Sequence, residues 1–274
     1  MLLLIILTAH FLGDFLLQNN AIASNKSKST KMAFKHIFIH FLLIAILVLI
    51  YEFFDSPLGS IIDLNEALIV GIVLVIHFLT DRFLKEVISK RFNNNFNSLL
   101  FDQIIHLIVI YLTFYFLRET DLTNFLNVIN SNYNLPKIYL SVLFAVLLLP
   151  FSNHLIQSIF IYLNKGEVTS NEEVKIIEKT VDNKTEIIKE RTILSKQEVT
   201  DYGKWIGYME RILVFTLVLL SSFEGILIVI ALKTFARFRQ LNNKSFVEKY
   251  LLGTLFSITL ALLLGLLFKY IMVI

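Results

Sequence analysis

The chain has 274 residues, of which 56% are hydrophobic and 17% charged, and its mean hydropathy is +0.70. This composition is too apolar for a water-soluble globular domain. The absence of cysteine excludes a disulfide framework and a thiolate metal site. The small net charge of +3 lies mainly in short loops, a pattern typical of membrane proteins, so we expect no nucleic-acid partner.

Eight apolar segments have about the length that a helix needs to cross a bilayer, which is about 20 residues. Only 3 Pro and 9 Gly occur, which favours long helices. The sequence therefore predicts an all-α fold, a polytopic transmembrane helical bundle of about eight spans. The segments are residues 1–18, 34–54, 64–84, 98–118, 137–161, 204–222, 224–240 and 247–272.

The first and seventh segments are short, and whether they cross the bilayer fully is left open by the sequence. We interpret the first as a retained span rather than a cleaved signal peptide. No basic residue precedes it, and His10, Gly13 and Asp14 interrupt its apolar run.

The charges of the loops predict the orientation. The first loop carries Lys26, Lys28, Lys31 and Lys35 without an acidic residue, whereas residues 52–66 carry four acidic residues and no basic one. The third loop and the loop before the last span are also basic. By the positive-inside rule these basic loops are cytoplasmic, which places both termini outside.

Residues 163–203 differ from the rest because they carry mixed charge. We predict a charged cytoplasmic insertion between a five-span N-terminal membrane unit, residues 1–162, and a three-span C-terminal membrane unit, residues 204–274. The insertion fits a helical hairpin, a small β-ribbon built on residues 173–177 and 185–194, or a solvated linker. It is also where a cytoplasmic protein partner would dock.

The first four spans contain an internal repeat. The sequence His-Phe-Leu-Gly-Asp at residues 10–14 returns as His-Phe-Leu-Thr-Asp at residues 77–81, an offset of 67. His36 and His40 correspond to Asp102 and His106 with an offset of 66. This agreement predicts a parallel repeat of two hairpins.

The same spans carry four polar pairs, each with its members four residues apart and hence on one face of a helix. In the predicted topology all eight side chains lie within about 3–12 Å of the cytoplasmic face, given a rise of about 1.5 Å per residue. Ionisable groups inside a span are costly and are by default functional or paired. The sequence predicts one shared metal site formed by His10/Asp14, His36/His40, His77/Asp81 and Asp102/His106.

Imidazole and carboxylate ligands suit Zn²⁺, Mn²⁺ or Fe²⁺. Eight candidates exceed one coordination shell, so we expect one or two ions, with the remaining groups supporting the ligands. Gln18 and Gln103 are candidates for orienting a carboxylate or for linking two helices, and His154 in the fifth span could join the site. The alternative is a polar or proton-relay network without metal.

The C-terminal unit carries fixed positive charge at the same predicted depth. Arg211, Lys233 and Arg237 could pair with Glu210, or they could bind an anionic substrate such as a phosphorylated lipid, because Arg and Lys are the usual phosphate ligands.

The motif His-Phe-Leu-Gly-Asp-Phe-Leu-Leu-Gln at residues 10–18 resembles the start of an uncharacterised bacterial inner-membrane family, a domain of unknown function that opens His-x-Leu-Gly-Asp-Phe-x-x-Gln. The family's His-x-x-x-His, His-x-x-x-Asp and Asp-Gln-x-x-His motifs are similar to residues 36–40, 77–81 and 102–106. Its longer members share Ile-Gly-x-x-Glu-Arg and Lys-x-x-x-Arg-Phe segments with residues 206–211 and 233–238. The resemblance implies a bacterial inner-membrane location and no particular activity.

Three functional hypotheses follow. The first is a membrane-embedded metal-dependent hydrolase of a phosphorylated lipid or similar anionic substrate, with Asp14 or Asp81 as general base. The second is a divalent metal-ion transporter, since paired His and Asp side chains on repeated helices also suit ion transport. The third is a non-enzymatic membrane partner or sensor in which the polar cluster is structural.

Overall fold

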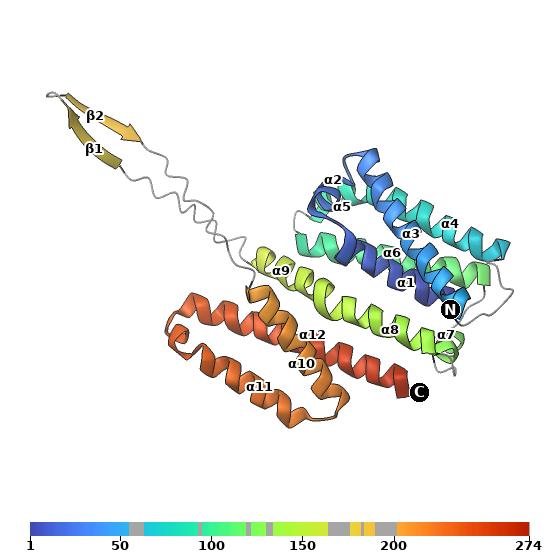
Figure 1. Ribbon diagram of the computed structural model, residues 1–274. Helices are drawn as coiled ribbons and strands as arrows, with labels where there is room; N and C mark the ends of the chain where they lie inside the picture. Colours follow the sequence, from blue (N-terminus) through green and yellow to red (C-terminus); the bar gives the residue numbers. More distant parts are fainter. Residues whose placement is uncertain are drawn as a thin grey trace.

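The computed structural model describes residues 1–54, 63–92, 95–118, 122–129, 134–163, 176–181, 184–189 and 202–273. These residues form an all-α bundle and one small β-ribbon (Figure 1). The α-helices are α1 (Leu2–Leu12), α2 (Asn20–Asn25), α3 (Thr30–Phe54), α4 (Leu64–Leu79), α5 (Lys85–Phe92), α6 (Asn95–Arg118), α7 (Leu122–Ile129), α8 (Asn134–Val146), α9 (Ser152–Leu163), α10 (Tyr202–Leu219), α11 (Phe223–Ala236) and α12 (Lys244–Val273).

Helix α1 lies at the centre of the N-terminal part of the bundle. It is apolar on all sides, and Leu4, Ile5, Ile6 and Ala9 are almost completely buried. It packs against α3, α6 and α8. A helix that is apolar all round is expected in a protein core or in lipid, and here its neighbours cover most of it.

A long helix, Asn134–Leu163, separates the two parts of the bundle. Helices α8 and α9 are joined by η3 (Leu147–Phe151), a π-helical turn around Pro150. Proline cannot donate a main-chain hydrogen bond and disturbs the preceding turn. The N-terminal helices α1 and α6 contact one side of this helix, and α10 and α12 contact the other (Figure 1).

Five helices of the described residues are long and apolar enough to cross a membrane: Thr30–Phe54, Leu64–Ile88, Phe96–Leu117, Asn134–Leu163 and Phe246–Met272. The segment Leu2–Leu17 is a shorter apolar helix. Helix α11 has 14 residues, so it extends about 21 Å, less than the bilayer core of about 30 Å. The structure confirms the all-α class, while the crossings by the first, sixth and seventh segments stay predictions.

The repeat extends from the sequence to the backbone. Helix α1 continues into a π-helical turn, η1 (Gly13–Leu17), and α4 continues into another, η2 (Thr80–Leu84). The two turns are 67 residues apart, which is the offset of the sequence repeat. Single π turns inside α-helices are rare and are frequent at functional sites.

The predicted insertion contains an antiparallel ribbon of strands β1 (Ile176–Val181) and β2 (Lys184–Lys189). Of the three structures that fit the sequence, the β-ribbon is the one that these residues form. The first strand starts and ends later than predicted, and the second starts and ends earlier. Cross-strand pairs such as Lys179 with Glu186 suit this register. The remainder of the insertion lies outside the described residues.

The orientation can be tested cleanly because the chain has no cysteine. Lys28 lies in the first loop and Asn65 in the first turn of α4; both are exposed, and the two positions are predicted to lie on opposite sides of the membrane. We expect a membrane-impermeant maleimide to label Asn65→Cys but not Lys28→Cys in intact cells, and both after permeabilisation. The reverse labelling pattern would invert the predicted topology.

Candidate metal centre

Four apolar helices and two π turns bring the eight predicted side chains to one place. Helices α1, α3, α4 and α6 supply the five histidines and Asp102, and the two π turns supply Asp14 and Asp81. Each of the eight residues is at most 7% exposed. Their ligand atoms form three groups, in each of which all atoms lie within 4.8 Å of one another: His10, Asp14, His40 and His77; His36, His77 and Asp81; and Asp81, Asp102 and His106.

The first group has the donor set of a mononuclear site. Three imidazoles and one carboxylate are a common shell for Zn²⁺ and also suit Mn²⁺ or Fe²⁺. The ring centroids of His40 and His77 are 4.5 Å apart, and those of His10 and His77 are 5.2 Å apart. The residues present therefore fit a divalent ion.

Hydrogen bonds to the main chain orient two of the imidazoles. The Nδ1–H of His40 donates to the carbonyl oxygen of His36 at 3.0 Å, and that of His106 donates to the carbonyl oxygen of Asp102 at 2.6 Å. The two histidines are counterparts in the repeat. Their Nε2 atoms are buried and have no hydrogen-bond partner among the described residues, which leaves the lone pair that a metal ligand needs.

The absence of a side chain at Gly13 leaves room for the imidazole ring of His40. A Cβ atom added at Gly13 would lie 2.5 Å from both Cε1 and Nε2 of His40, a distance that no carbon side chain tolerates. The counterpart of Gly13 in the second hairpin is Thr80. The two halves of the repeat are therefore not equivalent at the centre.

The supporting residues predicted from sequence lie at different distances from the centre. Gln103 is buried, and its Nε2 donates to Asp14 Oδ2 at 3.1 Å while its Oε1 lies 3.2 Å from His10 Nε2. Gln18 donates to the main-chain oxygen of Asp14 at 3.4 Å. His154 is exposed and packs on the Phe15 ring, with centroids 5.9 Å apart, so it is not part of the cluster.

Sequence reasoning missed Lys26, which it treated as one of several loop charges. The side chain is 1% exposed, and its Nζ lies 2.9 Å from Asp81 Oδ2, 3.1 Å from His36 Nε2 and 3.6 Å from Asp14 Oδ1. Burial alone would lower the pKa of this ammonium group, but Asp14, Asp81 and Asp102 outweigh burial and raise the pKa well above its usual range. Lys26 is therefore a fixed positive charge.

Two local features hold Lys26 in place. Asn19 caps the start of the short helix α2, and its side chain accepts a hydrogen bond from the main-chain N–H of Ile22 at 2.9 Å. Arg82, next to Asp81 on the other hairpin, donates to the carbonyl oxygen of Ser27 at 2.7 Å. The loop that carries Lys26 is thus anchored from both sides.

The charges at the centre favour one ion rather than two. Three carboxylates, of Asp14, Asp81 and Asp102, face the ammonium groups of Lys26 and Lys85, the latter 3.0 Å from Asp102 Oδ2. With neutral imidazoles, as metal ligands must be, these groups carry a net charge of −1. One divalent ion brings the sum to +1 and two bring it to +3, which burial disfavours strongly.

The predicted substrate-binding residues lie elsewhere. Arg211, Lys233 and Arg237 line a separate cavity of the C-terminal helices, and none of the eight clustered residues is part of its lining. The ion pair with Glu210 that the sequence offered as an alternative is present for Lys233.

The family of the N-terminal part is shown by comparison. Residues 2–135 match the model of a family described as "Protein of unknown function (DUF3307)". This segment is a DUF3307 domain. The DUF3307 domain contains all eight clustered residues and Lys26, whereas His154 and the C-terminal cations lie beyond it. No curated protein and no solved structure matches the chain.

We expect the purified protein to bind one divalent ion per chain. His77 belongs to two of the three ligand groups, so His77→Ala should lower metal affinity by at least about tenfold. Elemental analysis after dialysis against a weak chelator measures this. The matched control, His154→Ala, should bind like the wild type, and equal metal content in all three proteins would refute the site.

Replacing Lys26 should make stability depend on metal. Lys26→Met leaves Asp14 and Asp81 without their ammonium partner, which should cost about 3–5 kcal/mol in the metal-free state. Added Zn²⁺ should restore most of this loss. Thermal unfolding in detergent, with and without chelator, measures both effects. The exposed Lys28→Met serves as the control, and identical melting of the two variants would contradict the assigned role.

Proposed function

We propose that the chain is a membrane-embedded, metal-dependent hydrolase that acts on a phosphorylated lipid or a similar anionic substrate. The proposal rests on a division of the centre into the four-ligand group and a further carboxylate, Asp81, which belongs to the other two candidate groups. Asp81 is not in the four-ligand group. However, its Oδ2 lies 3.3 Å from Nε2 of His77, which belongs to that group. A metal site with an adjacent basic group is what hydrolysis by water requires.

The roles of the residues follow from this division. His10, Asp14, His40 and His77 would hold the ion, which supplies Lewis-acid catalysis and lowers the pKa of water. Asp81 would accept the proton from the attacking water. Lys26 and His36, at 2.9 Å and 3.1 Å from Asp81 Oδ2, hold this carboxylate in place.

The charge of the centre suits an anionic substrate. With one divalent ion the three carboxylates, Lys26 and the partly exposed Lys85 carry +1, as counted above, which offsets part of the negative charge of a phosphorylated substrate. Asp14 is the most exposed of the eight residues at 7%, and Leu16 and Leu17 next to it are exposed apolar side chains. A lipid-borne substrate would approach on this side.

A divalent metal-ion transporter is the second candidate. The closed burial of the cluster and the two π turns of the repeat favour it, because transport sites often lie between repeated units. The fixed ammonium of Lys26 disfavours it, because it repels a cation that must pass through. Entry of the ion into sealed proteoliposomes, without any hydrolysis, would establish transport instead.

Two aspartate variants test the hydrolase. With short-chain phosphatidic acid and an isoprenyl phosphate as probes, we expect release of phosphate by the metal-loaded protein. Asp81→Asn should keep the metal and lower kcat by about 10²–10⁴. Asp14→Asn should lose both metal and activity, because it removes a ligand.

The control is Glu224→Gln, an exposed carboxylate of α11 far along the chain from the centre. It should match the wild type in metal content and rate. The hydrolase assignment fails if Asp81→Asn turns over as fast as the wild type, or if neither probe is hydrolysed by metal-loaded protein.

A further inference from the structure

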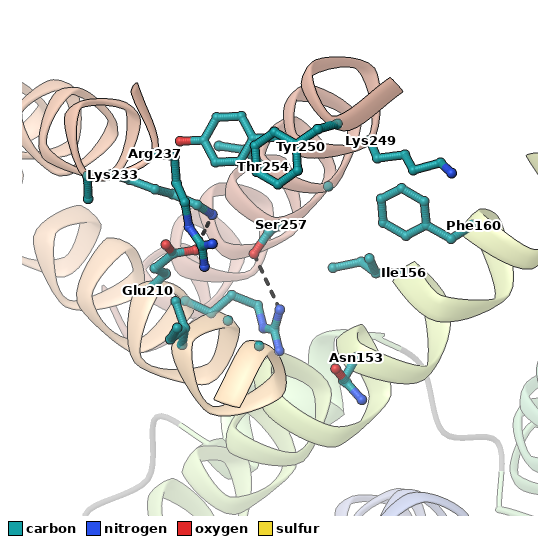
Figure 2. A pocket seen from close by; sticks show the side chains of 17 residues that line it. Asn153, Ile156, Phe160, Glu210, Lys233, Arg237, Lys249, Tyr250, Thr254 and Ser257 are labelled. Atoms are coloured by element: carbon teal, nitrogen blue, oxygen red, sulfur yellow. Dashed lines mark hydrogen bonds and ion pairs between the residues drawn. The ribbon is translucent and has the colours of Figure 1, made fainter. Parts of the chain in front are cut away.

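The C-terminal part of the bundle contains a cavity of about 670 Å³ between α9, α10, α11 and α12. This volume is typical of sites for small organic ligands. Four basic side chains and one carboxylate line it, which gives a net charge of +3. Figure 2 shows Lys233, Arg237 and Glu210 on one side of the cavity and Lys249 with Phe160 on the other.

Arg211 is the buried member of this set, with 3% of its surface exposed. Its Nε donates to the carbonyl oxygen of Leu148 at 2.8 Å, and its Nη1 donates to Ser257 Oγ at 3.3 Å, the dashed line at Ser257 in Figure 2. Nη2 has no hydrogen-bond partner among the described residues. A buried guanidinium with an unused donor is costly unless a ligand completes its bonding.

Thr254 gives a second, independent indication. Its hydroxyl is buried and also lacks a hydrogen-bond partner within the described ranges, and its residue lines the same cavity. The other cations are partly engaged, because Lys233 pairs with Glu210 and Arg237 donates to Gln240 at 2.9 Å. The unused donors of Arg211 and Thr254 therefore call for an acceptor of negative charge.

The walls of the cavity are apolar. Ile156 and Phe160 of α9, Ile206 of α10 and Phe246 of α12 lie between the charged groups. Lys233 and Lys249 lie near the ends of α11 and α12 that adjoin the basic loop before the last helix, and Arg237 directly follows α11; the positive-inside rule predicts the cytoplasmic surface there. A ligand for this cavity is anionic at one end and apolar at the other.

We propose that this cavity binds the terminal phosphate of an anionic membrane lipid, with Arg211 and Thr254 as direct hydrogen-bond donors. Guanidinium and hydroxyl groups are suited to phosphate oxygens, and the aromatic and aliphatic walls suit the start of the lipid chain. The site is distinct from the metal centre, because the helix Asn134–Leu163 lies between the two parts of the bundle (Figure 1). The proposal does not depend on the hydrolase.

Native mass spectrometry of the full chain in detergent tests this site. The probes are dihexanoyl phosphatidic acid, zwitterionic dihexanoyl phosphatidylcholine and inorganic phosphate. We expect phosphatidic acid to bind at least about tenfold more tightly than phosphatidylcholine, as a charge-assisted hydrogen bond implies. Inorganic phosphate should bind more weakly than phosphatidic acid, and equal binding would overturn the assignment to a lipid.

Variants separate the cavity from other binding surfaces. Arg211→Gln should weaken phosphatidic acid binding by about tenfold or more, and the nearly isosteric Thr254→Val should weaken it less while leaving the fold intact. Arg239→Gln is the matched control, because Arg239 is exposed and outside the lining. Metal content should stay unchanged in all three variants. Wild-type binding by Thr254→Val and Arg211→Gln would overturn the proposal.

Discussion

The neutralisation of buried carboxylates by Lys26 is the interaction on which the N-terminal domain depends. Asp14 and Asp81 sit inside a bundle of apolar helices, where an unpaired charge costs several kcal/mol. A folded domain is stable by only about 5–15 kcal/mol. The contacts of Lys26 with Asp14, Asp81 and His36 therefore decide whether the two hairpins can pack against each other at all.

The backbone is also irregular where these aspartates lie. The π turns at Gly13–Leu17 and Thr80–Leu84 interrupt the regular helices where the two aspartates must turn inward. The repeat supplies these turns twice, but the side chains differ: Gly13 corresponds to Thr80, and His36 to Asp102. A duplicated scaffold with unequal side chains gives a centre in which one carboxylate can be a ligand and another a base.

The sequence predicts the eight clustered residues because helical spacing fixes which side chains share a face, and the bilayer fixes their depth. Neither rule predicts that Lys26 lies in the cluster. Its position depends on the short helix α2 and on the hydrogen bond from Arg82 to Ser27. A count of charge could have indicated it, since three buried aspartates require cations. The sequence also groups three C-terminal cations correctly, since one cavity is lined by Arg211, Lys233 and Arg237. Helical periodicity could not predict that α8 and α9 pack between these cations and the histidines.

The buried ammonium group of Lys26 also explains how such a centre can form in the absence of a metal ion. Without Lys26, Asp14 and Asp81 would repel each other whenever the ion is absent, which would destabilise the packing of the two hairpins. With Lys26 in place the apolar core around α1 can form first, and the His40 and His106 nitrogens remain available to a ligand. Folding and binding of the proposed ion are then separable steps.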